Sequence, residues 1–381
     1  MIYLDHNATT PLDTQVGVVV RGAELAAFGN PSSIHAAGRS ARALLDESRE
    51  RLAVLWGCRP SEIVFTSGGT EANNLAVLGA ARARRDRGRH LITSAVEHPS
   101  VRQAFEYLAA REGFEVTILS TDPLGVIEPE EVRRALRPDT TLVSVMAANN
   151  EVGTLEPVRE IGELCREHGV CFHTDAVQWF GKEPVGAIDD FAADLVAACA
   201  HKLGGPRGAG VLYARSPLPL QPLLMGGSQE NDRRAGTENL PAIVGLVTAW
   251  ERFTKPPLFD RSRLEPLTAL LETRCLAIEG TRRWGPPLPQ RLANTLAITV
   301  SGCDSLSLLA GLDLAGVCAS SGSACSAGSL EPSHVLTSLG ASATEASGLV
   351  RFSLGPETTR AEVMAAAEAL AAVVTRVRKR G

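Results

Sequence analysis

A chain of 381 residues is longer than one hydrophobic core usually serves, so two packed domains are expected. Hydrophobic residues make up 44% of the chain and charged residues 21%, a composition that excludes a disordered protein. The net charge of -5 gives no basis for binding nucleic acid or a membrane, and no apolar run is long enough to cross a bilayer. The start, MIYLDHNATT, lacks the basic and then apolar layout of a signal peptide, so we expect a cytoplasmic protein.

The middle of the chain alternates short apolar runs with helical patterns. Strands are predicted at 62–65, 91–93, 116–119, 141–145, 170–173 and 194–198. The helical pattern TEANNLAVLGAARARR follows the first strand, and PVREIGELCREHG, with proline near its start and Gly169 as its stop signal, precedes the fifth. This alternation predicts an α/β fold with a mainly parallel sheet covered by helices.

The paired prolines of Lys255-Pro256-Pro257 mark the best candidate for a domain boundary, because they break a helix and stiffen a connection. Beyond them, SRLEPLTALLETRCLAI predicts a helix, residues 297–300 a strand and the alanine-rich end of the chain a terminal helix. We therefore expect a large domain over 14–257 and a smaller α+β domain made of 1–13 and 258–381.

The eight cysteines are scattered and form no CxxC pair, so a disulfide framework is not expected. Cys165, Cys171 and His173 lie near one another in sequence, but Cys165 belongs to a predicted helix and the other two to a predicted strand. Buried packing is the preferred interpretation of these residues, and no metal site is predicted.

Ser67-Gly68-Gly69-Thr70 lies between a predicted strand and a predicted helix. Glycine lets the backbone approach a ligand closely, and a helix start offers unpaired amide N–H groups to an anion. The loop has neither the ending of a nucleotide P-loop nor the spacing of a dinucleotide fingerprint. From these residues alone, a phosphate cradle and a plain turn are equally good interpretations.

Two ionisable residues follow buried strands. Lys202 comes after the apolar run DLVAACA and His201, where desolvation would lower the lysine pKa and free a neutral amine for Schiff-base formation. Asp175 ends the run VCFHTD, where a carboxylate needs a cationic partner such as a protonated pyridine nitrogen; an aspartate that only caps the next turn is the alternative. Gln178, one helical turn later, could donate to the phenolic oxygen of the same ring.

His98, in VEHP, can stack on an aromatic cofactor and exchange protons near neutral pH, although a loop histidine is more often only solvated. His201, beside Lys202, is an alternative candidate for the histidine that supports this chemistry. Arg351 interrupts the apolar run LVRFS. Its guanidinium suits the carboxylate of an amino-acid substrate, and a structural ion pair explains it equally well.

Cys325 lies in SSGSACSAGS, where no neighbour can pack a core, so we expect a mobile, exposed loop over about 318–332. An exposed cysteine is only a few per cent thiolate at neutral pH and needs a nearby cation or proton acceptor to react well. A mobile loop suits a thiol that must visit an active site and then a partner.

Together these segments resemble the cysteine desulfurases, within the class V aminotransferase-like group of fold-type I pyridoxal-phosphate enzymes. The resemblance implies a large domain with a mainly parallel seven-stranded sheet between helices, plus the smaller α+β domain. The Cys325 loop and its continuation SLEPSHV are most similar to the first group of the family, of the nitrogen-fixation type. The matching segments are YLDHNATT, FGNPSSIHAAG, EIVFTSGGTEANN, VEHPSV, SVMAANNEVGT, FHTDAVQ, AHKLGGPRG, GGSQENDRRAGTEN, SSGSACSAGSLEPSHVL and VRFSLG.

The resemblance also implies a role for each matching residue. Lys202 would hold pyridoxal 5'-phosphate and move the α-proton of the substrate, with Thr237 reaching the phosphate from the other subunit of a homodimer. Asn150 and Arg351 would hold the substrate carboxylate. The implied cofactor-binding residues are Gly69, Thr70, His98, Asp175, Gln178, Cys199, His201, Lys202 and Thr237.

The implied reaction converts L-cysteine to L-alanine and leaves a persulfide on Cys325, for an iron–sulfur scaffold or another sulfur acceptor. Two residues depart from the family pattern: His6 stands where asparagine is usual, and Cys199 where many relatives have a phosphate-binding serine, a stronger donor than a thiol.

Two other functions are compatible with parts of this sequence. Another pyridoxal-phosphate reaction, such as selenocysteine lysis or transamination, does not require a loop thiol, so Cys325 counts against it. A non-catalytic sulfur carrier or scaffold subunit has no need of Lys202, Asp175 and His98, which are all intact.

Overall fold

The computed structural model describes residues 1–322 and 332–379, and its largest sheet has seven strands in the order β2–β8–β7–β6–β5–β3–β4. Strands β3 to β7 are mutually parallel, whereas β8 runs antiparallel to its neighbours β2 and β7. The predicted mainly parallel sheet is therefore confirmed. The strands are β2 (Ile63–Thr66), β3 (His90–Ser94), β4 (Glu115–Leu119), β5 (Thr140–Ser144), β6 (Cys171–Asp175), β7 (Leu195–Cys199) and β8 (Gly210–Ala214).

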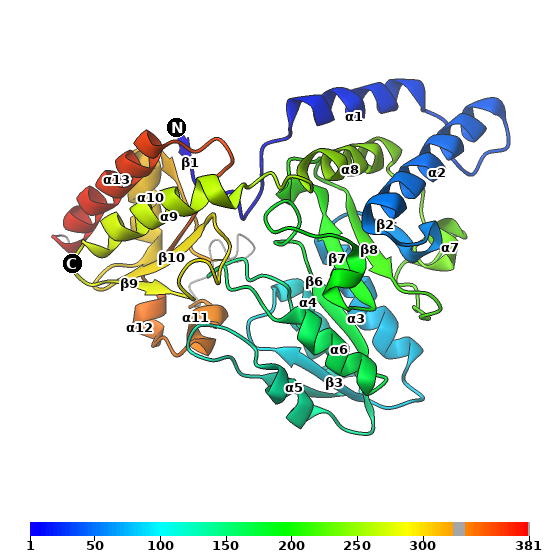
Figure 1. The fold of residues 1–381 in the computed structure, drawn as a ribbon, viewed down its shortest axis with the longest axis horizontal. Coiled ribbons are helices and arrows are strands. Elements are labelled where there is room, and N and C mark those ends of the chain that lie inside the picture. Colours follow the sequence, from blue (N-terminus) through cyan, green and yellow to red (C-terminus); the bar gives the residue numbers. More distant parts are fainter. Residues whose placement is uncertain (323–331, 380–381) are drawn as a thin grey trace.

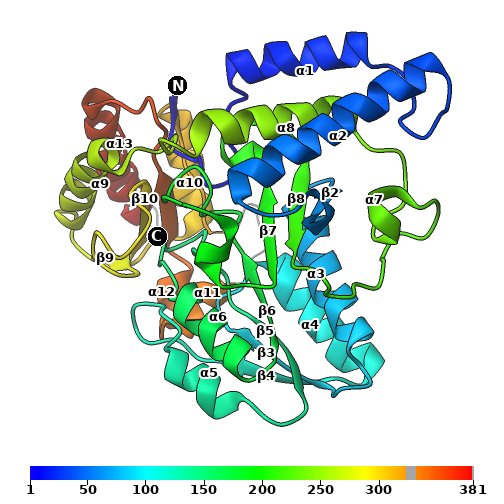
Figure 2. The same cartoon turned by 45° about the vertical axis from the view of Figure 1, so that its right-hand side comes forward.

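Helices cover both faces of this sheet, as Figures 1 and 2 show. Side chains alternate along each strand, so Phe172 and Val196 enter the core on one face while Cys171 and Leu195 enter the core on the other. The first core includes α1 (Thr14–Ala26), α2 (Ala36–Trp56), α5 (Pro129–Ala135), α6 (Val158–Glu167) and α8 (Leu240–Phe253), and the second includes α3 (Gly69–Ala83) and α4 (Pro99–Glu112).

A smaller unit lies beside the large sheet, at the left of Figure 1. It has an antiparallel sheet in the order β12–β10–β9 and its own core, which includes Leu4 from the start of the chain. This separate core supports the division into 14–257 and 1–13 with 258–381, which stays a proposal. The elements are β1 (Ile2–Tyr3), α9 (Arg261–Leu276), β9 (Thr281–Trp284), β10 (Thr295–Val300), α10 (Ser305–Leu314), β11 (Val317–Cys318), α11 (His334–Ser338), α12 (Ala343–Ala346), β12 (Leu349–Ser353) and α13 (Arg360–Arg378).

The parallel strands end at the edge of the sheet that faces the small unit. Asp175 is the last residue of β6, and Asn150 and Lys202 lie in the segments that follow β5 and β7. In open α/β sheets, ligands bind outside such carboxyl ends. None of the described helices is both long and apolar enough to cross a membrane.

A buried ion pair fastens the segment around α7 (Gln229–Asp232) to the large unit. Arg49 donates hydrogen bonds of 2.8 and 2.6 Å to the two carboxylate oxygens of Glu230, and the Phe65 N–H donates to the same carboxylate at 2.9 Å. The Glu230 side chain is fully buried, so water cannot replace these contacts.

We expect Glu230→Ala to lower the free energy of unfolding by about 3–5 kcal/mol, because Arg49 is left buried without its carboxylate. Chemical denaturation measures the loss. Glu24→Ala is the matched control: it breaks an exposed pair with Arg21 and should cost less than about 1 kcal/mol. Equal losses in the two variants would show that burial does not set the strength of the Arg49 pair.

Candidate active site

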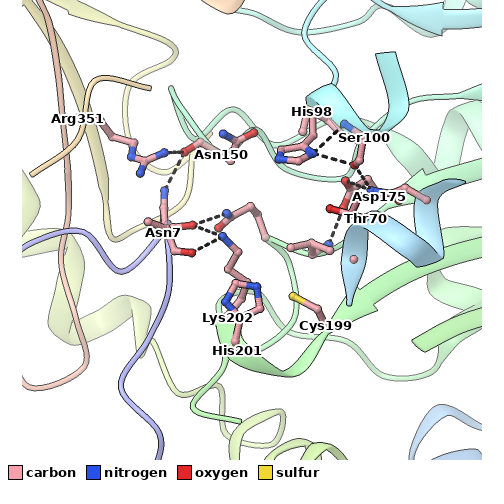
Figure 3. Close-up of a pocket in the computed structure, with 16 residues that line it drawn as sticks. Asn7, Thr70, His98, Ser100, Asn150, Asp175, Cys199, His201, Lys202 and Arg351 are labelled. Carbon is pink, nitrogen blue, oxygen red and sulfur yellow. Dashed lines mark hydrogen bonds between the residues drawn. The ribbon is translucent and has the colours of Figure 1, made fainter. Parts of the chain in front are cut away.

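A pocket lies where the carboxyl ends of the parallel strands meet the small unit and the N-terminal segment (Figure 3). It brings together ten of the residues singled out from the sequence: Gly69, Thr70, His98, Asn150, Asp175, Gln178, Cys199, His201, Lys202 and Arg351. The remaining lining residues are Asn7, Ala8, Asn73, Ser100, Met146 and Val177.

Two predicted site residues are not among those that line this pocket. Thr237 is exposed and lines a different cavity with Ser67 and Arg234, so its predicted role in a second subunit stays a prediction. Cys325 lies outside the described residues.

Lys202 follows β7 in a short 3-10 turn, Ala200–Lys202, and its amine is held by backbone carbonyls. The Nζ atom donates to the carbonyl oxygens of Asn7 at 2.5 Å and Ala8 at 2.8 Å. Burial lowers the pKa of Lys202, with the Arg351 guanidinium acting in the same direction. A lowered pKa increases the fraction of neutral, nucleophilic amine.

A chain of hydrogen bonds joins Asp175 to His98 (Figure 3). Asn73 Nδ2 donates to Asp175 Oδ2 at 2.6 Å and to Ser100 Oγ at 2.9 Å. The Ser100 N–H donates to Nδ1 of His98 at 3.1 Å, and Ser100 Oγ lies 2.8 Å from the same nitrogen. Because Nδ1 accepts the backbone N–H, we infer that the neutral His98 ring carries its proton on Nε2.

The pKa of His98 supports this neutral form. Burial lowers it, and the lowering outweighs the opposite effect of the Asp175 carboxylate. Protonation at Nδ1 would also require the loss of the Ser100 N–H bond. The ring can therefore stack on an aromatic group and donate from Nε2 without bringing a positive charge into the pocket.

The start of α3 forms the other end of the pocket. A Cβ atom at Gly69 would lie only 2.7 Å from Cγ2 of Val177, so the close approach of the two segments requires glycine. Burial lowers the pKa of His201 to about 4 and raises the pKa of Cys199 to about 11. The thiol therefore stays protonated and places no negative charge beside an anion at the helix start.

Arg351 lies on β12 and is 1% exposed. One guanidinium nitrogen donates to the Asn150 carbonyl at 2.9 Å and another donates to Asp5 Oδ1 at 2.7 Å. Its Nε has no partner among the described residues. The structural ion pair that the sequence left open is thus present, and the same side chain also lines the pocket.

Comparison with known proteins agrees with this geometry. The profile of the family described as aminotransferase class-V matches residues 2–365. The protein named cysteine desulfurase IscS of Dictyoglomus turgidum is 42% identical over 380 residues, which cover 99% of this chain and 95% of that one. The chain belongs to the aminotransferase class-V family, among its cysteine desulfurases.

Solved structures show the same relationship. One titled NifS-like protein has a TM-score of 0.90 at 33% identity and covers 98% of this chain and 99% of its own. Another, titled "SspA in complex with cysteine", has a TM-score of 0.81 at 35% identity and covers 94% and 100%. The nitrogen-fixation subtype stays a prediction, because the names of these relatives include both IscS and NifS-like.

Enzymes of this group depend on pyridoxal 5'-phosphate, and the pocket fits that cofactor. The start of α3, where Gly69 allows a close approach, suits a phosphate. The amine of Lys202 suits an aldehyde, and the buried Asp175 carboxylate suits a pyridinium nitrogen. The three sites surround one cavity, so a single molecule can meet all of them.

Asn7, Asn73 and Ser100 were not identified from the sequence, although they line the pocket and organise its hydrogen bonds. Each lies inside a motif that was quoted for the resemblance: YLDHNATT, TEANN and VEHPSV. Their presence as polar residues inside these motifs was the signal that could have identified them. His6, the departure from the family pattern, does not line the pocket; its ring packs against Tyr3 with centroids 4.8 Å apart.

Glu97, next to His98, is fully buried. Its Oε1 accepts hydrogen bonds from Ser94 Oγ at 2.6 Å and from the Met146 N–H at 2.9 Å, whereas Oε2 has no partner among the described residues. Burial raises the pKa of Glu97 from its ordinary 4.5 to about 8. The folded protein therefore keeps a proton that the unfolded chain has released, and stability falls as pH rises between these two values.

Glu97→Gln removes this titration while nearly preserving the shape of the side chain. As pH rises from about 5 to about 8, we expect the parent to lose stability relative to the variant by up to about 1.4 kcal/mol per pH unit. Urea denaturation at several pH values measures the difference. Glu131→Gln, at an exposed position, should give a difference that does not change with pH. A pH-independent difference for Glu97→Gln as well would contradict the raised pKa.

Proposed function

We propose that this protein is a pyridoxal-phosphate-dependent cysteine desulfurase that converts L-cysteine to L-alanine and places the sulfur on Cys325 as a persulfide. The observation that carries the proposal is one pocket lined by Lys202, Asp175 and Arg351. These residues supply an amine of lowered pKa, a buried carboxylate and a guanidinium suited to the carboxylate of an amino acid.

The residues around the pocket would divide the binding of cofactor and substrate between them. The start of α3 with His201 and Cys199 would hold the phosphate, completed by Thr237 of a second copy in a homodimer. His98 would stack on the ring, while Asp175 and Gln178 would meet its nitrogen and phenolic oxygen. When bound, the cofactor withdraws electrons from the substrate carbons, so that bonds at the α- and β-carbons become easier to break.

The protein's own groups would orient the substrate and move its protons. Arg351 and Asn150, which both line the pocket, bind the substrate carboxylate. Lys202 accepts the α-proton at Nζ, because its lowered pKa leaves the amine able to take up a proton. His98 donates a hydrogen bond from Nε2, since its Nδ1 accepts the Ser100 N–H and the neutral ring carries its proton on Nε2.

Cys325 would then accept the sulfur. Its thiolate attacks the sulfur of the substrate: an S–S bond forms, the Cβ–S bond breaks, and the carbon fragment keeps the electron pair. The fragment takes up one proton at its β-carbon, regains the α-proton from Lys202 and leaves as L-alanine. The persulfide passes its outer sulfur to an acceptor protein, such as an iron–sulfur scaffold.

The described chain on either side of the Cys325 segment lies beside the pocket. Ser320 exchanges backbone hydrogen bonds of 3.1 and 2.6 Å with Arg351. Ser333 Oγ donates to Oε2 of Glu151 at 2.5 Å, and a Cβ atom built on Gly322 would lie 2.8 Å from the same oxygen. Because Glu151 follows the pocket residue Asn150, Gly322 and Ser333, on the two sides of the Cys325 segment, lie next to the proposed substrate site.

Mass spectrometry after brief exposure to L-cysteine tests this proposal. We expect the parent to gain one sulfur atom on the peptide that contains Cys325, and Cys325→Ala to gain none there while its release of alanine falls to background. Cys58→Ala, at a half-buried cysteine, should behave like the parent. Alanine release that survives Cys325→Ala would favour another pyridoxal-phosphate reaction, and a protein that never takes up the cofactor would favour a scaffold role.

Arg351→Lys tests the substrate carboxylate site. The lysine keeps a positive charge but cannot form the paired hydrogen bonds of a guanidinium, so we expect the KM for L-cysteine to rise by about 10- to 100-fold. Initial rates of sulfide release in the presence of a reductant measure it. Arg263→Lys, on the exposed face of α9, should leave the KM unchanged. An unchanged KM in Arg351→Lys would leave Arg351 with only its structural pairing to Asp5.

A further inference from the structure

A second buried lysine lies directly behind the wall of the pocket. Lys182 is 2% exposed, and it does not belong to the residues that line the pocket. Burial lowers the pKa of Lys182 well below its usual range, and the nearby Lys202 and Arg351 act in the same direction. An amine is costly to bury without a specific partner, so its contacts indicate what it does there.

Within residues 1–322 and 332–379, the hydrogen-bond partners of Lys182 are two side-chain amides and no carboxylate. Its Nζ atom donates to Oδ1 of Asn7 at 2.6 Å and to Oε1 of Gln178. The neighbouring carboxylate of Glu183 is already paired with Arg261 at 2.5 Å. The ring of Phe259 closes another side of the site, with its centroid 5.4 Å from Nζ.

These two contacts fix which way each amide faces. Both contacts run from Nζ to an amide oxygen: a charged lysine has only donors, and a neutral amine still has two N–H groups for these two acceptors, so each amide turns its oxygen toward Lys182. Their NH₂ groups then face the opposite side. Asn7 Nδ2 donates to the Asn150 carbonyl at 3.2 Å and to Thr295 Oγ1 at 2.9 Å, while Gln178 Nε2 donates to the Asn7 carbonyl at 2.9 Å.

The orientation matters because Asn7 and Gln178 both line the pocket. Gln178 Nε2 has two hydrogens, and only one of them has an acceptor among the described residues. A reversed amide would instead turn its oxygen toward the carbonyl oxygen of Asn7, two acceptors that repel each other. The same Asn7 carbonyl accepts from Lys202, so a change at Gln178 also reaches that amine.

We propose that Lys182 is a positioning residue that holds the Gln178 amide with its N–H side toward the pocket, where it meets the phenolic oxygen of the cofactor. This inference rests on the proposed cofactor site and does not depend on the sulfur-transfer step. Lys182 acts through Gln178 and Asn7 and does not itself touch the ligand.

Titration of the apoprotein with pyridoxal 5'-phosphate, followed by fluorescence quenching, tests the inference without any turnover. Lys182→Met and Gln178→Ala should each weaken binding about tenfold, the worth of one hydrogen bond. The double variant should lie within about threefold of Gln178→Ala, because both changes remove the same contact, whereas independent effects would multiply to about 100-fold. The absorption band of the bound cofactor should shift alike in both single variants.

Lys255→Met is the matched control, since Lys255 is exposed and its one hydrogen bond within the described part of the chain goes to the Gly186 carbonyl. The affinity of this variant should equal that of the parent. Thermal melting of each apoprotein shows whether the variant is folded. If Lys182→Met does not fold, Lys182→Gln replaces it in the same cycle with Gln178→Ala.

Multiplying effects, or parental affinity in the Lys182 variant, would overturn the role of Lys182 even in a protein that forms the persulfide. A protein that binds the cofactor with the expected coupling but forms no persulfide would overturn the proposed reaction alone.

Discussion

The arrangement of the pocket depends on Asn7, which is 1% exposed and ties the small unit to the large one. Its carbonyl oxygen accepts from Lys202 and Gln178 of the large unit, and its N–H donates to Ser353 Oγ on β12. Its side chain accepts from Lys182 as well. Since one residue contacts both units, the amine of Lys202 and the guanidinium side of the pocket are held in a fixed relation.

Burial adjusts the charge of the groups in the pocket and behind its walls. It lowers the pKa values of Lys202, Lys182 and His98 and raises that of Glu97, so the desolvated groups shift toward neutral forms. Such an environment costs stability in the empty protein. A ligand that supplies a phosphate to the start of α3 and a cationic ring nitrogen to Asp175 offsets part of that cost, so cofactor binding should be linked to folding stability.

The sequence predicted the strands of the large sheet well, because buried parallel strands are continuous apolar runs between helical segments. The strand β8, from the run GVLYA, was not predicted. An apolar run does not show in which direction its strand will lie, so neither the antiparallel pairing of β8 nor the order of the strands could be predicted. Asp175, which ends such a strand, and Lys202, which follows one, could be found in the same way. The bond from Asn73 to Ser100 and the pairing of Arg351 with Asp5 join residues from separate segments, and only the folded chain shows them.

The proposed reaction places opposite demands on the amine and on the thiol. Lys202 needs burial, because a lower pKa frees its lone pair, whereas burial raises the pKa of a thiol and removes its thiolate, as it does for Cys199. A nucleophilic cysteine built into the strand ends would therefore be inert. The proposed reaction instead takes its thiol from a separate segment of small polar residues, which would avoid this effect of burial. The described chain on both sides of that segment, at Gly322 and Ser333, meets Glu151 next to the pocket residue Asn150.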